Sequence, residues 1–139
     1  MASHWEHFYH GADVGVRGIG ETLEQAYTQA AIALTAIVTD PSLVRPLKKV
    51  DIVCVEPERE LLLVDWLNAI IYEMAVRNML FGQFDVVLGA QGIDAHAYGE
   101  AIDRSRHRPA VEPKGATCTK LRVYRQDDGS WVAQCVVDV

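Results

Sequence analysis

The sequence has few cysteines, no long apolar run and a deficit of positive charge, and each shortage excludes a class of protein. Its three cysteines, Cys54, Cys118 and Cys135, are scattered along the chain and form no CxxC pair. The sequence therefore indicates neither a zinc site nor a disulfide framework. All three lie in strand-like apolar runs, where we expect buried, inert thiols and a reducing, cytoplasmic setting.

No apolar run reaches the roughly eighteen residues that a membrane-spanning helix needs. The longest apolar stretch, 61–79, is broken by the polar residues Asp65, Asn68, Glu73 and Arg77. We therefore expect a buried helix there and no membrane span. The opening segment MASHWEHF has neither a basic region nor an apolar one, so we expect no secretory signal.

Basic residues are the third shortage, because 13 Lys and Arg stand against 19 Asp and Glu, giving a net charge of −6. Phosphate contacts from basic side chains supply most of the non-specific affinity of proteins for RNA or DNA. The longest basic run, RSRHR at 104–108, is short. We expect no strong direct binding to nucleic acid, so any action on RNA would go through a partner.

The 139 residues suffice for one domain with its own core, which we assign to 1–139. Apolar residues at spacings of three and four predict a helix over 22–39. Thr22 is its expected N-cap, and Gln25 completes a capping box. The Asp40-Pro41 pair should end the helix, because a residue before proline disfavours the α region.

A second, largely apolar helix is predicted from Pro57, placed in its first turn, to about Asn78, with Gly82 ending that region. Apolar and alternating runs predict strands at 5–16, 50–55, 84–88, 93–102, 117–124 and 131–139. The last four strands would form two hairpins, joined by a polar loop at 104–114. We expect an α+β fold, with two helices packed on one face of a largely antiparallel sheet.

Three glycines lie close together before the first predicted helix, at Gly15, Gly18 and Gly20. Their spacing matches neither the dinucleotide-binding pattern nor the P-loop pattern. Glu21 and Glu24 would also repel a phosphate at the helix N-terminus. We therefore interpret the glycines as a tight strand-to-helix turn, in which glycine supplies a positive φ.

Asp13 is a single charge in an apolar, strand-like run, and taken alone it indicates a solvent-facing residue or the start of a turn. The sequence ends QCVVDV, so Asp138 and the terminal carboxylate of Val139 would concentrate two anionic groups at one strand tip. If that tip lies near Asp13, three oxygen-bearing groups converge. Such a cluster either becomes partly protonated or binds a hard cation, Ca²⁺ or Mg²⁺.

The histidines and Asp65 are weaker candidates for a functional site. His4, His7 and His10 recur every three residues, but on a strand His7 would face away from the other two, so partly exposed strand histidines are favoured over a metal site. Asp65 interrupts the second helix, as a polar edge shared with Asn68 or as a carboxylate that faces a site. No sequence pattern supplies a Ser-His-Asp or Cys-His nucleophile.

Five stretches together resemble the archease family, in the family's order and across nearly the whole chain. They are HFYHGADVGVRGIGETLEQAY, LLLVDWLNAIIYE, MLFGQFDV, KGATCTKLRV and the terminal VVDV. One position departs from the family pattern. Many archeases carry Tyr-His where this chain has Cys118-Thr119, so any role of that histidine is absent here.

The resemblance implies the archease variant of the strand-helix-strand-strand module. It implies a non-enzymatic activator of the tRNA-splicing RNA ligase that guanylylates its own histidine with GTP and Mn²⁺, acting in tRNA splicing or RNA repair. It also implies a divalent metal site, often Ca²⁺, that maps to Asp13, Asp138 and Val139. Two other interpretations stay open: a chaperone-like binding module for RNA-modifying enzymes, and a metal-dependent hydrolase.

Overall fold

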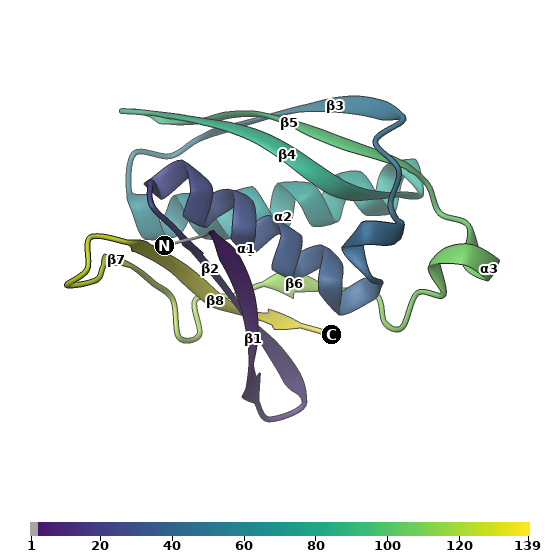
Figure 1. The fold of residues 1–139 in the computed structure, drawn as a ribbon, viewed down its shortest axis with the longest axis horizontal. Helices are drawn as coiled ribbons and strands as arrows, with labels where there is room; N and C mark the ends of the chain where they lie inside the picture. Colours follow the sequence, from purple (N-terminus) through teal and green to yellow (C-terminus); the bar gives the residue numbers. More distant parts are fainter. Residues whose placement is uncertain (1–2) are drawn as a thin grey trace.

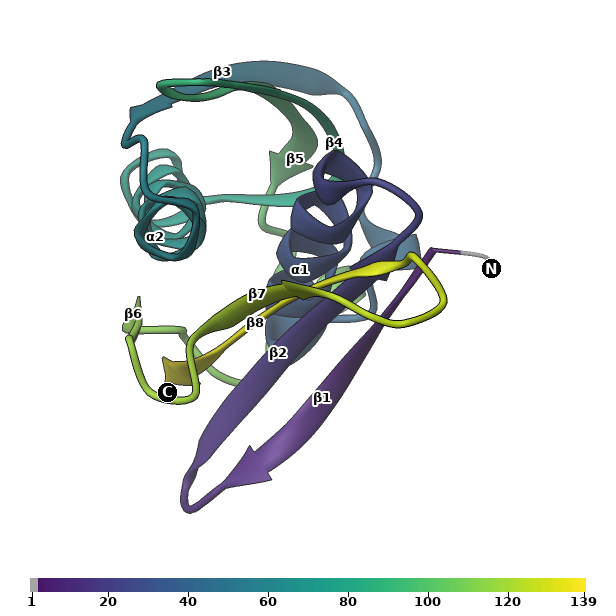
Figure 2. The same ribbon diagram turned by 90° about the vertical axis from the view of Figure 1, so that its left-hand side faces the viewer.

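The strands form two antiparallel sheets, with the two long helices between them (Figure 1, Figure 2). The computed structural model describes residues 3–139, and the first two residues of the MASHWEHF segment lie outside this range. The five-stranded sheet has the order β1 (His4–His10), β2 (Asp13–Gly20), β8 (Trp131–Asp138) and β6 (Gly115–Ala116), with β7 (Arg122–Arg125) also paired to β8. The three-stranded sheet has the order β3 (Lys48–Val55), β5 (Gly92–Ala101) and β4 (Met79–Gly89). The helices are α1 (Leu23–Val38), α2 (Arg59–Arg77) and the short α3 (Arg104–His107), with a 3-10 turn at Pro41–Leu43.

The predicted α+β class with antiparallel pairing is confirmed, but the strands divide between two sheets where one was expected. α1 packs against β2 on one side and against β4 on the other. Its buried residues are Ala26, Tyr27, Ala30, Ala31, Ala33, Leu34, Thr35, Ile37 and Val38. A helix with so wide an apolar surface needs cover on two sides, and the second sheet supplies it.

Both long helices begin at side-chain caps. The Thr22 hydroxyl accepts a hydrogen bond from the N–H of Gln25 at 3.1 Å, as predicted. The Gln25 side chain reaches back to the N–H of Glu21 at 2.8 Å, so the capping box is displaced by one residue. α2 begins after Glu58, whose carboxylate accepts from the N–H of Leu61 at 2.7 Å, and Pro57 therefore precedes the helix.

The end of α2 agrees with the prediction of about Asn78, but the expected role of Gly82 is wrong. Asn78 adopts the left-handed conformation with φ of 53° and caps the helix, and β4 begins at the next residue. Gly82 lies inside β4, where the pairing with β5 shifts between Phe81 and Gln83. A Cβ at Gly82 would stand 2.9 Å from the carbonyl oxygen of Pro41, so this glycine permits a close contact and does not end a region.

The interpretation of Gly15, Gly18 and Gly20 as a positive-φ turn is wrong. All three lie within β2, and none has a positive φ. A Cβ on Gly18 would stand 2.1 Å from the carbonyl oxygen of Ala26, and a Cβ on Gly15 would meet the ring of Phe8. The glycines therefore give α1 and Phe8 room to lie directly on the strand.

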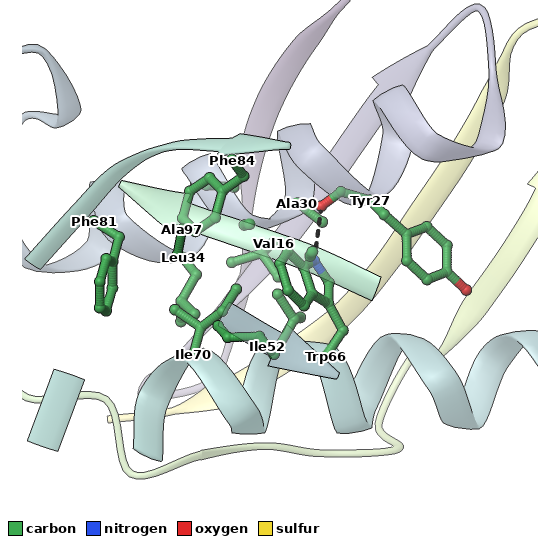
Figure 3. Close-up of a cluster of buried hydrophobic side chains, with 14 of the residues drawn as sticks. Val16, Tyr27, Ala30, Leu34, Ile52, Trp66, Ile70, Phe81, Phe84 and Ala97 are labelled. Carbon is green, nitrogen blue, oxygen red and sulfur yellow. Dashed lines mark hydrogen bonds between the residues drawn. The ribbon is translucent and has the colours of Figure 1, made fainter. Parts of the chain in front are cut away.

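The core lies between the sheets and is centred on the fully buried Trp66 of α2 (Figure 3). The indole N–H of Trp66 donates to the carbonyl oxygen of Tyr27 at 3.1 Å, which ties α2 to α1. The ring of Phe84 meets the indole edge-on, with 5.9 Å between ring centroids and 78° between planes. This edge-to-face geometry is one of the two favoured for aromatic pairs, and Figure 3 shows Leu34 and Ile70 in the same cluster.

The C-terminal half follows the predicted strand order with changed boundaries. β4 and β5 pair as a hairpin, but β4 starts at Met79 and not near residue 84. β7 and β8 form the second predicted hairpin, while the short β6 pairs separately with the end of β8. The loop predicted at 104–114 contains α3.

The cysteines differ in burial, although all were expected inside. Cys135 is buried on β8, and burial raises the pKa of its thiol to about 12. Cys54 is half-buried, but Cys118 is exposed because it lies in the turn between β6 and β7.

The helices are also too short or too polar for a membrane span: no helix within residues 3–139 is long and apolar enough to cross a membrane.

We predict that Gly18→Ala destabilises the protein by about 3 kcal/mol, because the new methyl group overlaps the backbone of α1 and neither element can yield cheaply. The matched control is Gly89→Ala, where a Cβ meets nothing within 4 Å, and its change should stay within about 0.5 kcal/mol. Urea unfolding measures both free energies. Equal stability of the two variants would contradict the close packing of α1 on β2.

Candidate functional site

The candidate site lies where β2 begins and β8 ends, in the middle of the five-stranded sheet. Val14 of β2 pairs with Val137 of β8, so Asp13 and Asp138 are the next residues outward from this pair. Residues that oppose each other on antiparallel strands project to the same face of the sheet. The fold therefore brings both aspartates to one strand tip, although 125 positions separate residue 13 from residue 138 in the sequence.

A hydrogen bond closes this tip. The main-chain N–H of Val139 donates to Oδ1 of Asp13 at 3.2 Å. The side chains of Asp13 and Val139 are partly buried, whereas Asp138 is exposed. The sequence pattern left the proximity of Asp13 to the end of β8 open, and the structure shows it.

Neighbouring elements hold the end of β8 in place. The N–H of Lys114 donates to the carbonyl oxygen of Asp138 at 2.8 Å, and Gly115 of β6 pairs with Asp138. Asn68 of α2 in turn holds β6, because its side chain accepts from the N–H of Ala116 at 2.8 Å and donates to the carbonyl oxygen of Ala116 at 3.2 Å. The sequence suggested only a polar helix edge at Asn68, and no local pattern indicates that its partner lies 48 residues away.

The donor atoms at the tip suit a hard divalent cation. A carboxylate offers about four lone pairs, and the N–H of Val139 uses one of those on Asp13. Within residues 3–139, no three His, Cys, Asp or Glu side chains are gathered closely enough to hold a metal ion. The residues that could hold a cation here are Asp13, Asp138 and Val139, because carboxylate and main-chain oxygens are the ligands that Ca²⁺ prefers.

The three early histidines belong to β1 and are not gathered around a metal position. His4 and His10 pair with Ile19 and Asp13, and share a face as predicted. His7 points to the other face, where its Nε2 lies 2.7 Å from the carbonyl oxygen of Ala33 in α1.

The other singled-out positions lie as follows. Asp65 is exposed on α2, in agreement with the polar-edge interpretation. Cys118-Thr119 lies in the turn after β6, and the carbonyl oxygen of Thr119 accepts from the N–H of Val136 at 3.0 Å. The position where this chain departs from the family pattern is therefore close to the end of β8.

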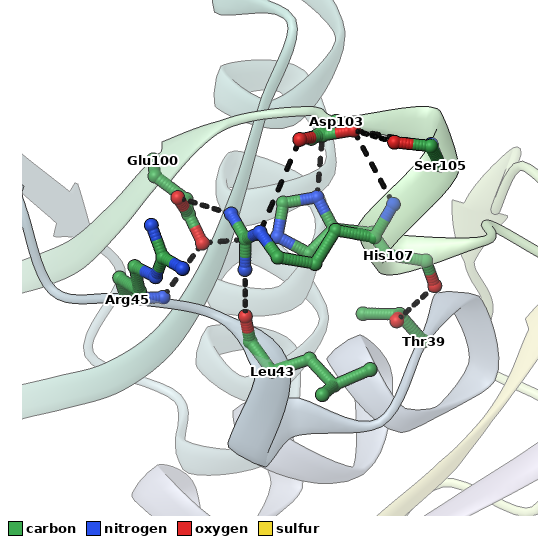
Figure 4. Close-up of polar contacts among 8 residues, drawn as sticks. Thr39, Leu43, Arg45, Glu100, Asp103, Ser105 and His107 are labelled. Atoms are coloured by element: carbon green, nitrogen blue, oxygen red, sulfur yellow. Dashed lines mark hydrogen bonds and ion pairs between the residues drawn. The ribbon is translucent and has the colours of Figure 1, made fainter.

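A buried polar cluster lies at the far end of β5 and was missed by sequence reasoning (Figure 4). Glu100 and His107 are both buried, and Nε2 of His107 lies 3.0 Å from Oε2 of Glu100. Nδ1 of His107 accepts the N–H of Asp103 at 2.9 Å, so the ring proton sits on Nε2 and donates to Glu100. Arg106 completes the cluster with an ion pair to Glu100 at 2.5 Å.

This cluster fixes α3 against the end of β5 and the 3-10 turn. The Arg106 guanidinium holds the pKa of Glu100 well below its usual range, at about 2, and the N–H of Arg45 and the His107 ring add to the effect. Asp103 caps α3 by accepting from the N–H of Ser105 at 3.1 Å. An aspartate three residues before Arg106, at the end of a strand, was the available sequence signal for this short helix.

The fold and the tip together define a class: a small α+β domain in which the second strand and the last strand, paired side by side, carry an oxygen-rich tip. The family model described as the archease protein family matches residues 5–139. The chain belongs to the archease family.

Individual relatives agree over their full lengths. The chain is 34% identical to the protein archease of Pyrococcus furiosus, over 97% of this chain and 98% of the relative. It is 35% identical to the protein archease of Methanopyrus kandleri, over 97% of this chain and 99% of the relative.

Two solved structures share the fold. The solution structure of protein 1598 from Methanobacterium thermoautotrophicum matches with a TM-score of 0.84 and 27% identity, covering 97% of this chain and 98% of that chain. The crystal structure of an archease from Thermotoga maritima, described there as a possible chaperone, matches with a TM-score of 0.61 and 15% identity, covering 95% of this chain and 94% of that chain. The second likeness shows the fold alone.

We predict that Glu100→Gln changes how stability depends on pH. Because the pKa of Glu100 is lowered on folding, its ionised form stabilises the protein fully above about pH 5 and progressively less as the pH falls toward about 2. The variant should therefore be less stable than the wild type near neutral pH, and the difference should shrink on acidification. Urea unfolding across this pH range checks it, with the exposed Glu112→Gln as control. A difference that is constant with pH would contradict the assignment.

Proposed function

We propose that this chain activates the RNA ligase that guanylylates its own histidine with GTP and Mn²⁺, and that it does so through the tip formed by Asp13, Asp138 and Val139. The observation that carries the proposal is the hydrogen bond from Val139 to Asp13, because it brings the oxygen ligands of both sequence ends to one point. Membership of the archease family supports the choice of partner.

The physical role of the tip follows from its charge. A ligase that binds RNA and GTP needs a basic surface, and a chain of net charge −6 is attracted to such a surface. A cation held by Asp13, Asp138 and Val139 would supply a local positive charge toward triphosphate oxygens. Asp13 would therefore have two roles: one carboxylate oxygen accepts the hydrogen bond from the N–H of Val139, and the negative charge of the carboxylate holds the cation.

The test measures transfer of labelled GTP to the ligase histidine, with this chain first stripped of metal and then supplied with Ca²⁺ at constant Mn²⁺. We predict that Asp13→Asn lowers the stimulation by about tenfold or more, because the amide can still accept from Val139 but carries no charge for a cation. Asp127→Asn is the matched control, since Asp127 is exposed in the β7–β8 turn at the opposite end of β8.

Each outcome separates the candidate functions. Full stimulation by Asp13→Asn, or stimulation indifferent to Ca²⁺, would contradict a role for the tip. GTP turnover by this chain without ligase would indicate the metal-dependent hydrolase. Absence of both activities would leave the chaperone-like binding module for RNA-modifying enzymes.

A further inference from the structure

The β1–β2 hairpin extends away from the rest of the molecule (Figure 1, Figure 2). An aromatic residue, Tyr9, lies near its end. The turn of the hairpin is Gly11-Ala12, and Gly11 has a positive φ of 60°. Tyr9, just before the turn, is 98% exposed, so its ring has almost no contact with the rest of the chain. Among the large apolar side chains of residues 3–139 that are exposed, the next is Val55 at 80%.

Tyr9 lies beside the candidate site but on the other face of the hairpin. It pairs with Val14, whereas the neighbouring His10 pairs with Asp13. Successive residues of a strand point to opposite faces. The hairpin end therefore presents a phenol ring on one face and the Asp13 carboxylate on the other.

These two features favour a partner that receives the hairpin end in a cleft. Tyrosine is enriched among the residues that anchor protein interfaces, because its ring buries a large area at a low entropic cost. Asp13 and the exposed Asp138 give the same end a negative charge, which a basic wall of the cleft would complement. A nucleotide cleft that binds triphosphate and RNA has this basic character.

We propose that the end of the β1–β2 hairpin is the segment that docks on the RNA ligase, with the Tyr9 ring as its apolar anchor. The inference rests on the proposed function and adds to it the contact that determines affinity. Asp13 and Asp138 act on the ligase after docking, whereas Tyr9 holds the two proteins together. Kinetics can separate the two roles. A docking residue determines the concentration of this chain that half-saturates the ligase, whereas a site residue determines the maximal stimulation of guanylylation.

The experiment titrates this chain into the ligase guanylylation reaction and measures two quantities, the half-saturating concentration and the maximal stimulation. We expect Tyr9→Ala to raise the half-saturating concentration by about tenfold or more while the maximal stimulation stays within about twofold. Tyr9→Phe, which keeps the ring, should behave like the wild type. Val55→Ala, on the three-stranded sheet, is the control for loss of an exposed apolar side chain, and it too should match the wild type.

The outcomes distinguish failure of the anchor from failure of the proposed function. Absence of stimulation by the wild type overturns both. Stimulation with an unchanged half-saturating concentration for Tyr9→Ala overturns the anchor alone, as does an equal loss for Val55→Ala. A rise in the KM for GTP in place of the half-saturating concentration would assign Tyr9 to nucleotide contact and overturn docking. Unchanged thermal unfolding of Tyr9→Ala confirms that the variant is folded.

Discussion

The antiparallel pairing of β2 with β8 is the constraint on which the rest of the structure depends. It joins the second strand of the chain to the last one and forms the centre of the five-stranded sheet. A shift of one residue in this register would turn every side chain of a strand to the opposite face, and Asp13 would no longer oppose Asp138. The pairing also places Gly18 under α1, so the approach of the first helix and the composition of the tip depend on the same register.

The two long helices could be predicted from the sequence because their signals are local. Thr22 and Gln25 act within one turn of the helix that they cap, and apolar spacing is visible in the sequence itself. The division of strands between two sheets could not be predicted, because each strand chooses its partner over long distances in sequence. The role of the three glycines of β2 could not be predicted either, because glycine permits both a positive φ and a close backbone contact. Only the packing of α1 on β2 shows which of the two applies.

The candidate site was predictable in part. The sequence singled out Asp13 as a charge inside an apolar run and Asp138 as a charge at the end of a strand, and the structure brings their strands together. The support that Asn68 gives to β6 was not predictable, because its partner Ala116 lies 48 positions away. The separate contact between Glu100 and His107 was not predictable either, because His107 lies in a segment that is polar in sequence. Supporting side chains of this kind have no fixed spacing from the residues that they support.

We propose that the tip of β2 and β8 holds a divalent cation, and calorimetric titration of the metal-free protein with Ca²⁺ tests this proposal most directly. The account predicts one saturable site, weakened about tenfold or more by Asp13→Asn and unchanged by Asp127→Asn. Absence of binding to the wild type, or equal affinity in the wild type and Asp13→Asn, would contradict it.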